Sequence, residues 1–125
     1  MAERLTLLRR AAERRGHRSE SLAALLLRLK FYRILGRRVK THAGEIDLVA
    51  LSPSGLVCFV EVKARGEERM AALSVSPRQQ ARIAHAATLF LAKRPALAKK
   101  GVRFDIVAVA PRRLPRHLPD AWRPQ

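Results

Sequence analysis

The amino-acid sequence predicts an α/β fold, a mixed sheet of about four strands flanked by helices, in the order helix, three strands, helix, strand. Three observations support this: an apolar helical pattern near residue 25, three strand-like segments between residues 32 and 64, and a second helical pattern followed by one more apolar strand. The 125 residues, at 14.0 kDa, leave no room for a second core. We therefore expect a single domain over residues 1–125.

The N-terminal segment, residues 1–16, is predicted to be a basic helix or arm because arginines recur along it. Gly16 is expected to end this segment, and Ser19 to cap a second helix. Leucines at helical spacing predict the buried stripe of that helix: Leu22, Leu25, Leu26 and Leu29. Glu20 lies off this stripe, on a face that small and apolar residues continue, so its side chain can still point inward.

Three strands are predicted over residues 32–41, 45–51 and 56–64, because these segments are rich in β-branched and apolar residues. Between the last two lies Ser52-Pro53-Ser54-Gly55, which suits a tight turn with proline at its first corner and glycine in the left-handed position. The second and third strands are therefore expected to be antiparallel neighbours.

A second helix is predicted to begin at Ser76, with Pro77 at the first helical position and Gln79 at the capping-box position. An apolar stripe at spacings of three and four residues is expected to pack on the sheet: Ile83, Ala86, Ala87, Phe90 and Leu91. Pro95 ends the helix.

Residues 102–110 predict a strand inside the sheet, and the Pro- and Arg-rich tail, residues 111–125, is expected to be irregular. Within that strand, Asp105 is expected to form an ion pair with Arg103 or a hydrogen bond to nearby backbone. Trp122 is expected to anchor the tail, with base stacking as the alternative.

Cysteine and histidine give little support for a soft-metal site. The single cysteine, Cys58, excludes an internal disulfide and a multi-cysteine metal site, and it is expected in the core. The histidines lack metal-ligand spacing and are expected to be surface or phosphate contacts: His17, His42, His85 and His117.

The net charge of +16 favours a polyanionic partner, most commonly nucleic acid, with an anionic membrane surface as the competing explanation. No apolar window is long enough to span a bilayer and no signal peptide is recognised, so a cytoplasmic protein is expected. The candidate nucleic-acid-binding residues are Arg37, Arg38, Lys40, Arg65, Arg78 and Arg82. Residues 41–62, in contrast, contain no lysine or arginine, which predicts an acidic pocket within a basic rim.

Carboxylates gather in the predicted hairpin. A turn that pairs Ser52 with Leu56 places Asp47 opposite Glu61, and in the same register Glu45 faces Lys63. Facing carboxylates repel unless a cation lies between them, and hard oxygen ligands suit Mg²⁺ better than zinc. The expected ligands are Asp47, Glu61 and a backbone carbonyl, that of Val62. The alternative is a set of cross-strand ion pairs that contribute little energy.

Two motifs, Gly-Glu-Ile-Asp-Leu at residues 44–48 and Phe-Val-Glu-Val-Lys at residues 59–63, resemble the YraN family. Residues 32–35, 103–105 and 115–118 also resemble family segments. That family is placed in the restriction-endonuclease-like fold, with the PD-(D/E)XK nuclease signature and Holliday-junction resolvases as relatives. The resemblance implies that Asp47 is the first catalytic acid and that Glu61 and Lys63 form the E-x-K pair.

The resemblance also implies a catalytic glutamate at Glu20 and a glutamine on the following helix, at Gln79 or Gln80. The alternatives are a first-turn acid favoured by the helix dipole for Glu20 and the capping box for Gln79. One departure is Phe31, where relatives commonly have glycine, and it puts the local turn in question rather than the acidic site.

Three functions follow as hypotheses. The first is a Mg²⁺- or Mn²⁺-dependent nuclease that hydrolyses DNA rather than RNA, branched or single-stranded, and acts as a homodimer if its substrate is symmetric. The second is a nucleic-acid-binding protein that keeps the fold but cleaves little or nothing. The third is a basic scaffold bound to ribosomal RNA or an anionic membrane, which would need no divalent cation.

Overall fold

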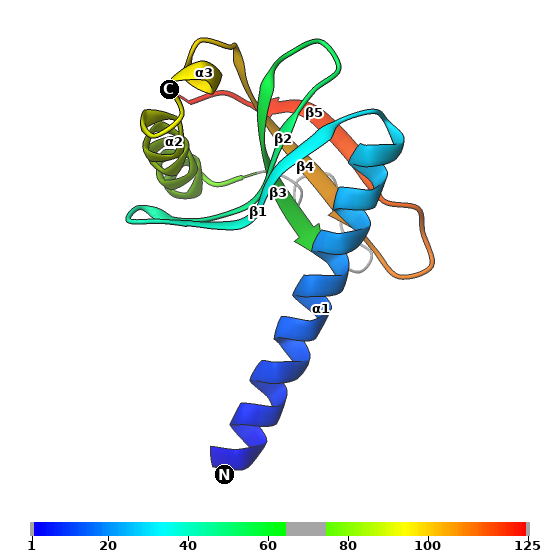
Figure 1. The fold of residues 1–125 in the computed structure, drawn as a ribbon. Coiled ribbons are helices and arrows are strands. Elements are labelled where there is room, and N and C mark those ends of the chain that lie inside the picture. Colours follow the sequence, from blue (N-terminus) through cyan, green and yellow to red (C-terminus); the bar gives the residue numbers. More distant parts are fainter. Residues whose placement is uncertain (1, 65–74, 125) are drawn as a thin grey trace.

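The computed structural model describes residues 2–64 and 75–124, and of residues 11–15 it describes the backbone alone. The elements are α1 (Ala2–Leu29), β1 (Arg33–Thr41), β2 (Gly44–Leu51), β3 (Val57–Ala64), α2 (Pro77–Ala92), α3 (Pro95–Ala98), β4 (Val102–Val109) and β5 (Arg116–Trp122) (Figure 1). The five strands form one sheet in sequential order, in which β3 and β4 are parallel and the other neighbours are antiparallel. This confirms the predicted mixed α/β fold and is compatible with a restriction-endonuclease-like core.

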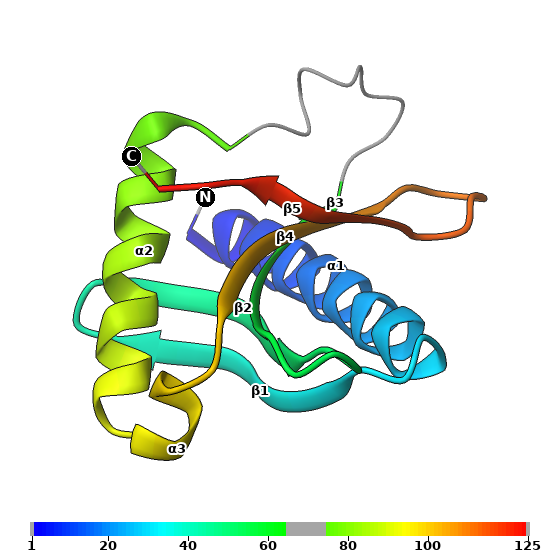
Figure 2. The ribbon, with the colours of Figure 1, turned by 90° about the horizontal axis from the view of Figure 1, so that it is seen from above.

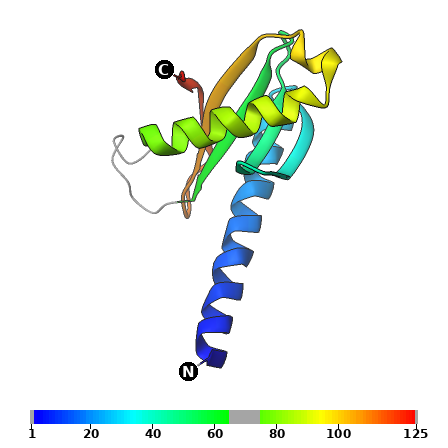
Figure 3. The ribbon, with the colours of Figure 1, turned by 90° about the vertical axis from the view of Figure 1, so that its left-hand side faces the viewer.

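The sheet lies between two helices, with α1 on one face and α2 on the other (Figures 2 and 3). On the α2 face, Phe59 of β3 packs among the aromatic rings of Phe90 and Phe104. On the α1 face, Leu27 packs with buried residues of β2 and β3, such as Leu48 and Val60. Because both faces are covered, the central strands are apolar almost throughout.

Helix α1 differs from the prediction in two ways. It runs through Gly16 without a break, because one glycine costs a helix only about 1 kcal/mol and the flanking residues favour helix. The predicted leucine stripe is wrong, since Leu22, Leu25 and Leu29 are 44%, 51% and 70% exposed. The buried face consists of smaller side chains around one leucine: Ser19, Glu20, Ala23, Ala24 and Leu27. The small side chains allow the helix backbone to lie close to the sheet.

Helix α1 ends in the turn around Phe31, the position at which the sequence departs from the family that it resembles. The Tyr32 amide donates to the Leu27 carbonyl at 2.9 Å, which is the closing hydrogen bond of a Schellman motif. Phe31 lies at the left-handed position of this motif with φ of 68°. Glycine suits such a position, so Phe31 keeps the turn at the expense of backbone strain.

The turn between β2 and β3 agrees with the prediction. Gly55 has φ of 92°, and its amide donates to the Ser52 carbonyl at 2.9 Å. The first pair after the turn is Leu51 with Val57, and the last is Leu48 with Val60. This is the predicted register.

The C-terminal tail is not irregular as predicted, because residues 116–122 form β5 on the outer edge of β4. The backbone groups of β4 need partners on this side, and an edge strand can accommodate Pro119. Trp122 anchors the strand end as expected, with its ring 4.3 Å from that of Phe104.

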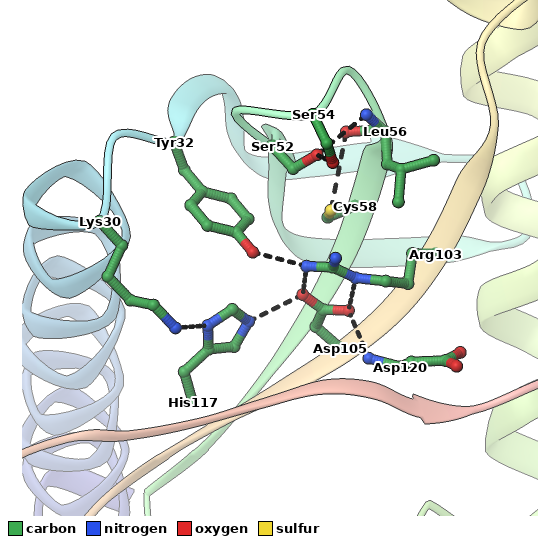
Figure 4. A network of polar contacts seen from close by, with 10 residues as sticks. All are labelled: Lys30, Tyr32, Ser52, Ser54, Leu56, Cys58, Arg103, Asp105, His117 and Asp120. Carbon is green, nitrogen blue, oxygen red and sulfur yellow. Dashed lines mark hydrogen bonds and ion pairs between the residues drawn. The ribbon is translucent and has the colours of Figure 1, made fainter.

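A network of polar side chains connects β4, β5 and the end of α1 (Figure 4). Asp105 is fully buried and accepts hydrogen bonds from both nitrogens of the Arg103 fork at 2.8 Å and from the Asp120 amide at 3.0 Å. Arg103 also donates to the Tyr32 hydroxyl at 2.6 Å. The expected Asp105–Arg103 ion pair is therefore confirmed, within a larger network.

His117 also belongs to this network, so the expectation that it is a surface or phosphate contact is wrong. Its side chain is 2% exposed, and its Nε2 lies 2.8 Å from an oxygen of Asp105. The Lys30 ammonium, which can only donate, lies 2.6 Å from Nδ1. Nδ1 is therefore the acceptor, and Nε2 carries the proton that is donated to Asp105.

No helix in residues 2–64 and 75–124 combines the length and the apolarity that crossing a bilayer requires.

Candidate active site

The candidate site lies where β2 and β3 separate. Their pairing ends at Leu48 and Val60, one residue before Asp47 and Glu61. Beyond that point Asp47 turns its Oδ2 to the Val62 amide, which donates to it at 2.8 Å. The register predicted from the turn thus brings Asp47 beside the Glu61–Val62 segment.

A change in side-chain direction accompanies this separation. Ile46 and Leu48 are two residues apart on β2 and should share a face, yet Ile46 packs on the α2 side and Leu48 on the α1 side. The neighbours of Arg38 and Asp47 are paired between β1 and β2, but these two opposite residues are not. Arg38 has φ of 50°. The strand pair is therefore distorted at Asp47, and neither residue type gives a sequence signal for this distortion.

Both acids carry raised pKa values. Burial raises the pKa of Asp47, the hydrogen bond from Val62 opposes this, and the charges of Glu20 and Glu45 raise the pKa further. Burial also raises the pKa of Glu61, with help from the charge of Asp47, to about 7. The two carboxylates are therefore held close together without enough positive charge to compensate them.

Lys63 and Arg82 supply part of that compensation, since both lower the pKa of Glu61. Lys63 is two residues from Glu61 on β3, so the two side chains leave the strand on the same face. Arg82 comes from α2, is exposed, and lies with its aliphatic stem over Gly44.

Gln79 also reaches the site. Its Nε2 donates to Glu61 Oε1 at 2.9 Å, while its backbone amide donates to the Ser76 hydroxyl at 3.2 Å. The predicted helix cap is therefore present, but the Gln79 side chain is directed to Glu61 rather than back to Ser76. Gln80 instead donates to the Val75 carbonyl at 2.9 Å, at the start of α2. Of the two candidate glutamines, the structure thus brings Gln79 to the acids.

Glu20 is 6% exposed and lies well inside α1, so it is not an acid of the first helical turn. Its carboxylate pairs with Arg37 Nε at 3.0 Å and with Arg38 Nε at 3.2 Å. Arg38 also lies 3.6 Å from Glu45, so the ionic partner of Glu45 is Arg38 rather than the predicted Lys63. Glu20 still acts on the site through its charge, which raises the pKa of Asp47.

The other basic candidates are Lys40, Arg78 and Arg65. Lys40 and Arg78 are exposed, and neither has a contact with the acids in the described part of the chain. Arg65 lies outside the described residues.

The donor set fits a hard divalent cation. In residues 2–64 and 75–124 no group of three or more His, Cys, Asp or Glu side chains could hold a metal. Two carboxylates, Asp47 and Glu61, remain with the backbone of Val62, and Mg²⁺ commonly takes few protein oxygens and completes its shell with water and phosphate. A cation here would offset the burial and the charge of Asp47, which together raise the pKa of Glu61.

Comparison with known proteins gives the family. The chain is 56% identical over 114 residues to a UPF0102 protein of Parvibaculum lavamentivorans, which covers 91% of this chain and 85% of that protein. It is 57% identical over 117 residues to a UPF0102 protein of Paramagnetospirillum magneticum, with 90% of each chain covered. The model of the uncharacterised protein family UPF0102, for which YraN is an equivalent name, matches residues 19–109. The chain therefore belongs to the uncharacterised protein family UPF0102.

Proposed function

We propose that this protein is a Mg²⁺- or Mn²⁺-dependent nuclease that hydrolyses phosphodiester bonds in DNA. The observation that carries the proposal is the pair Asp47 and Glu61, held together where β2 and β3 separate, with the pKa of Glu61 raised to about 7. A fold selected for stability alone would not place two partly buried carboxylates near each other without full compensation of their charge. Strongly perturbed acids of this kind cluster at functional sites.

Asp47, Glu61 and the carbonyl of Val62 would hold the metal. When bound, the ion would act as a Lewis acid on the phosphate and lower the pKa of a bound water. The protein prepares this site with two hydrogen bonds: Gln79 fixes one oxygen of Glu61, and the Val62 amide fixes one oxygen of Asp47. Both acids are thereby oriented before substrate arrives.

Lys63 is assigned to the reacting phosphate. Its ammonium leaves β3 on the same face as Glu61 and lowers the pKa of that acid. A fixed cation at this position can stabilise the negative charge that develops on the phosphate oxygens during hydrolysis. The net charge of +16 supports binding of the remaining DNA backbone through counterion release.

The raised pKa of Glu61 predicts a stability effect with a definite sign. The free-acid form contributes stability that is fully present below pH 4.5 and is lost as pH rises through about 7. We expect Glu61→Gln, which removes this charge and keeps an acceptor for Gln79, to stabilise the metal-free protein by about 2 kcal/mol at pH 8. Thermal unfolding in EDTA at pH 4.5 and pH 8 would measure it.

The matched control for this change is Glu45→Gln, because Glu45 is 41% exposed and paired with Arg38. The charge of Glu45 is a minor cause of the raised pKa of Asp47, so Glu45→Gln should change the pH dependence of stability much less than Glu61→Gln does. A Glu61→Gln protein that is less stable than the wild type at pH 8 would contradict the assigned electrostatics.

A second candidate function is nucleic-acid binding without cleavage. It is favoured by Glu20, whose carboxylate is neutralised by Arg37 and Arg38 and is thereby kept from binding a metal. Under this alternative, Asp47→Ala would leave binding unchanged or tighter, since it removes a negative charge that repels phosphate.

The experiment that separates the two functions is incubation of the purified chain with labelled linear, forked, single-stranded and four-way DNA, and with RNA of matched sequence. Cleavage of DNA in Mg²⁺ or Mn²⁺ that stops in EDTA is the expected result. Binding to these substrates without cleavage in either metal would support the second function instead.

A further inference from the structure

A cavity of about 460 Å³ lies at the opposite end of α2 from the acids, between that helix and the end of the β1–β2 hairpin. Figure 2 shows α2 crossing the hairpin near its turn, which joins Thr41 to Gly44. Val39 from β1 and Leu89 and Phe90 from α2 supply the apolar part of its lining. We call this cavity the hairpin pocket.

Apart from Thr41 and Ala92, the rest of the lining is basic. Lys40 and His42 come from the hairpin, and Lys93 and Arg94 follow the end of α2. Among the described residues, the lining of the cavity includes no aspartate or glutamate. An apolar floor with a basic rim fits a ligand that has a flat apolar part and a phosphate, which is the chemistry of a nucleotide.

Arg94 supplies a preformed stacking surface. Its guanidinium carbon lies 3.8 Å from the centroid of the Phe90 ring, and its NH1 donates to the Phe90 carbonyl at 3.0 Å. Phe90 is itself 3% exposed, so the ring is a fixed support. Because Arg94 is exposed, the guanidinium face turned away from Phe90 is open to a second planar group, and arginine planes commonly stack on unpaired bases.

Helix α2 connects the hairpin pocket to the acids. Gln79, which holds Glu61, and Phe90, which supports Arg94, are separated along the helix by about 16 Å. Arg82 lies between them and faces the hairpin at Gly44. A strand whose phosphate lies at the acids could therefore follow α2 to the hairpin pocket.

We infer that the hairpin pocket binds one unpaired nucleotide of the substrate strand. The base stacks on the guanidinium of Arg94, and the phosphate contacts Lys40 and Lys93. This inference rests on the proposed function and deepens it, because a pocket that needs an unpaired base selects single-stranded or branched DNA over a continuous duplex.

The test compares binding of an intact single-stranded oligonucleotide with binding of the same strand without its bases, by fluorescence anisotropy in EDTA so that nothing is cleaved. Both strands carry the same phosphates, so the ratio of the two affinities reports on base contacts. We define the ratio as the affinity for the intact strand divided by the affinity for the strand without bases. For the wild type we expect this ratio to be about five- to tenfold larger than for Arg94→Lys, which keeps the positive charge and loses the planar guanidinium.

Lys100→Met is the matched control, because Lys100 is exposed and lies outside the hairpin pocket; its ratio should equal that of the wild type. The inference would be overturned if the ratio were the same in Arg94→Lys and the wild type, or if it fell equally in Arg94→Lys and Lys100→Met. In either case the proposed function would remain. A wild-type chain that binds neither strand would overturn both. Since the measured quantity is a ratio within one variant, a partly unfolded preparation does not imitate the expected result.

Discussion

Asp105→Ala is expected to lower the free energy of unfolding by about 3–5 kcal/mol, the usual cost of removing one partner from a buried charged network. Burial tends to raise the pKa of Asp105, but the hydrogen bonds from His117, Arg103 and the Asp120 amide outweigh it and lower the pKa to about 2. The mutation would leave the buried His117 Nε2 without its acceptor and would leave Arg103 with the Tyr32 hydroxyl alone. Urea unfolding at pH 7 measures the change.

The matched control is Asp120→Asn. Asp120 lies on β5, the neighbouring edge strand, and its carboxylate pairs with the exposed Arg123. It has φ of 51°, which asparagine tolerates better than alanine. This variant should unfold at nearly the wild-type urea concentration. If Asp105→Ala also unfolded at nearly the wild-type urea concentration, the network would not stabilise the packing of β5 or of the end of α1.

The network around Asp105 also leads us to expect a loss of stability at acid pH. Because the pKa of Asp105 is lowered from 3.8 to about 2, its contribution is present above pH 3.8 and is lost as pH falls toward 2. The sign is opposite to that of Glu61, whose free-acid form is the stabilising one. The two carboxyl groups thus differ in electrostatic compensation: the charge of Asp105 is fully compensated, and that of Glu61 only in part.

Lys63→Met is expected to reduce DNA cleavage by about 10²–10³-fold, the usual cost of removing one group that stabilises charge in the transition state. Methionine retains the unbranched stem, so the packing on β3 should survive. Because Lys63 is one cation among many, the affinity for uncleaved DNA should change only severalfold. Single-turnover cleavage with excess enzyme measures the rate of the chemical step.

Lys99→Met is the control for the change in net charge, since Lys99 is exposed and follows α3, away from the acids. Its single-turnover rate should stay within severalfold of the wild type. Equal losses in Lys63→Met and Lys99→Met would show that Lys63 contributes only general attraction for DNA.

The acid hairpin could be predicted from sequence because its geometry depends on one short turn. Once Ser52 pairs with Leu56, the register of the strands is fixed as far as Leu48 and Val60, and Asp47 and Glu61 follow directly after that pair. The distortion at Arg38 and Asp47 could not be predicted, because a left-handed arginine has no compositional signature.

The face of α1 was predicted wrongly for a reason of packing. The pattern of leucines identifies the most apolar stripe, whereas burial depends on how closely the helix backbone approaches the sheet. Ala23 and Ala24 permit that close approach, which leaves Leu25 exposed and brings Glu20 inside. A search for small residues beside a lone acid would have favoured the correct face.

The Asp105–Arg103 pair was predicted, but the rest of the network around Asp105 was missed because its other members are distant in sequence. Lys30 and His117 are 87 residues apart, so no local spacing indicates that they meet. The prediction that the tail is irregular also hid the contact, since His117 reaches Asp105 only when residues 116–122 form β5. The available signal was an aspartate within a largely apolar strand, which demands partners for its buried charge.

The central claim is that Asp47 and Glu61 form a reaction centre for phosphodiester hydrolysis, and the most direct measurement is cleavage by Asp47→Asn. The substrate is the labelled DNA that the wild type cuts fastest in Mg²⁺ or Mn²⁺. We predict that the variant binds this DNA at least as tightly as the wild type and cuts it at least about a hundredfold more slowly. Cleavage at the wild-type rate by Asp47→Asn, or a wild type that cuts none of the substrates in either metal, would contradict the claim.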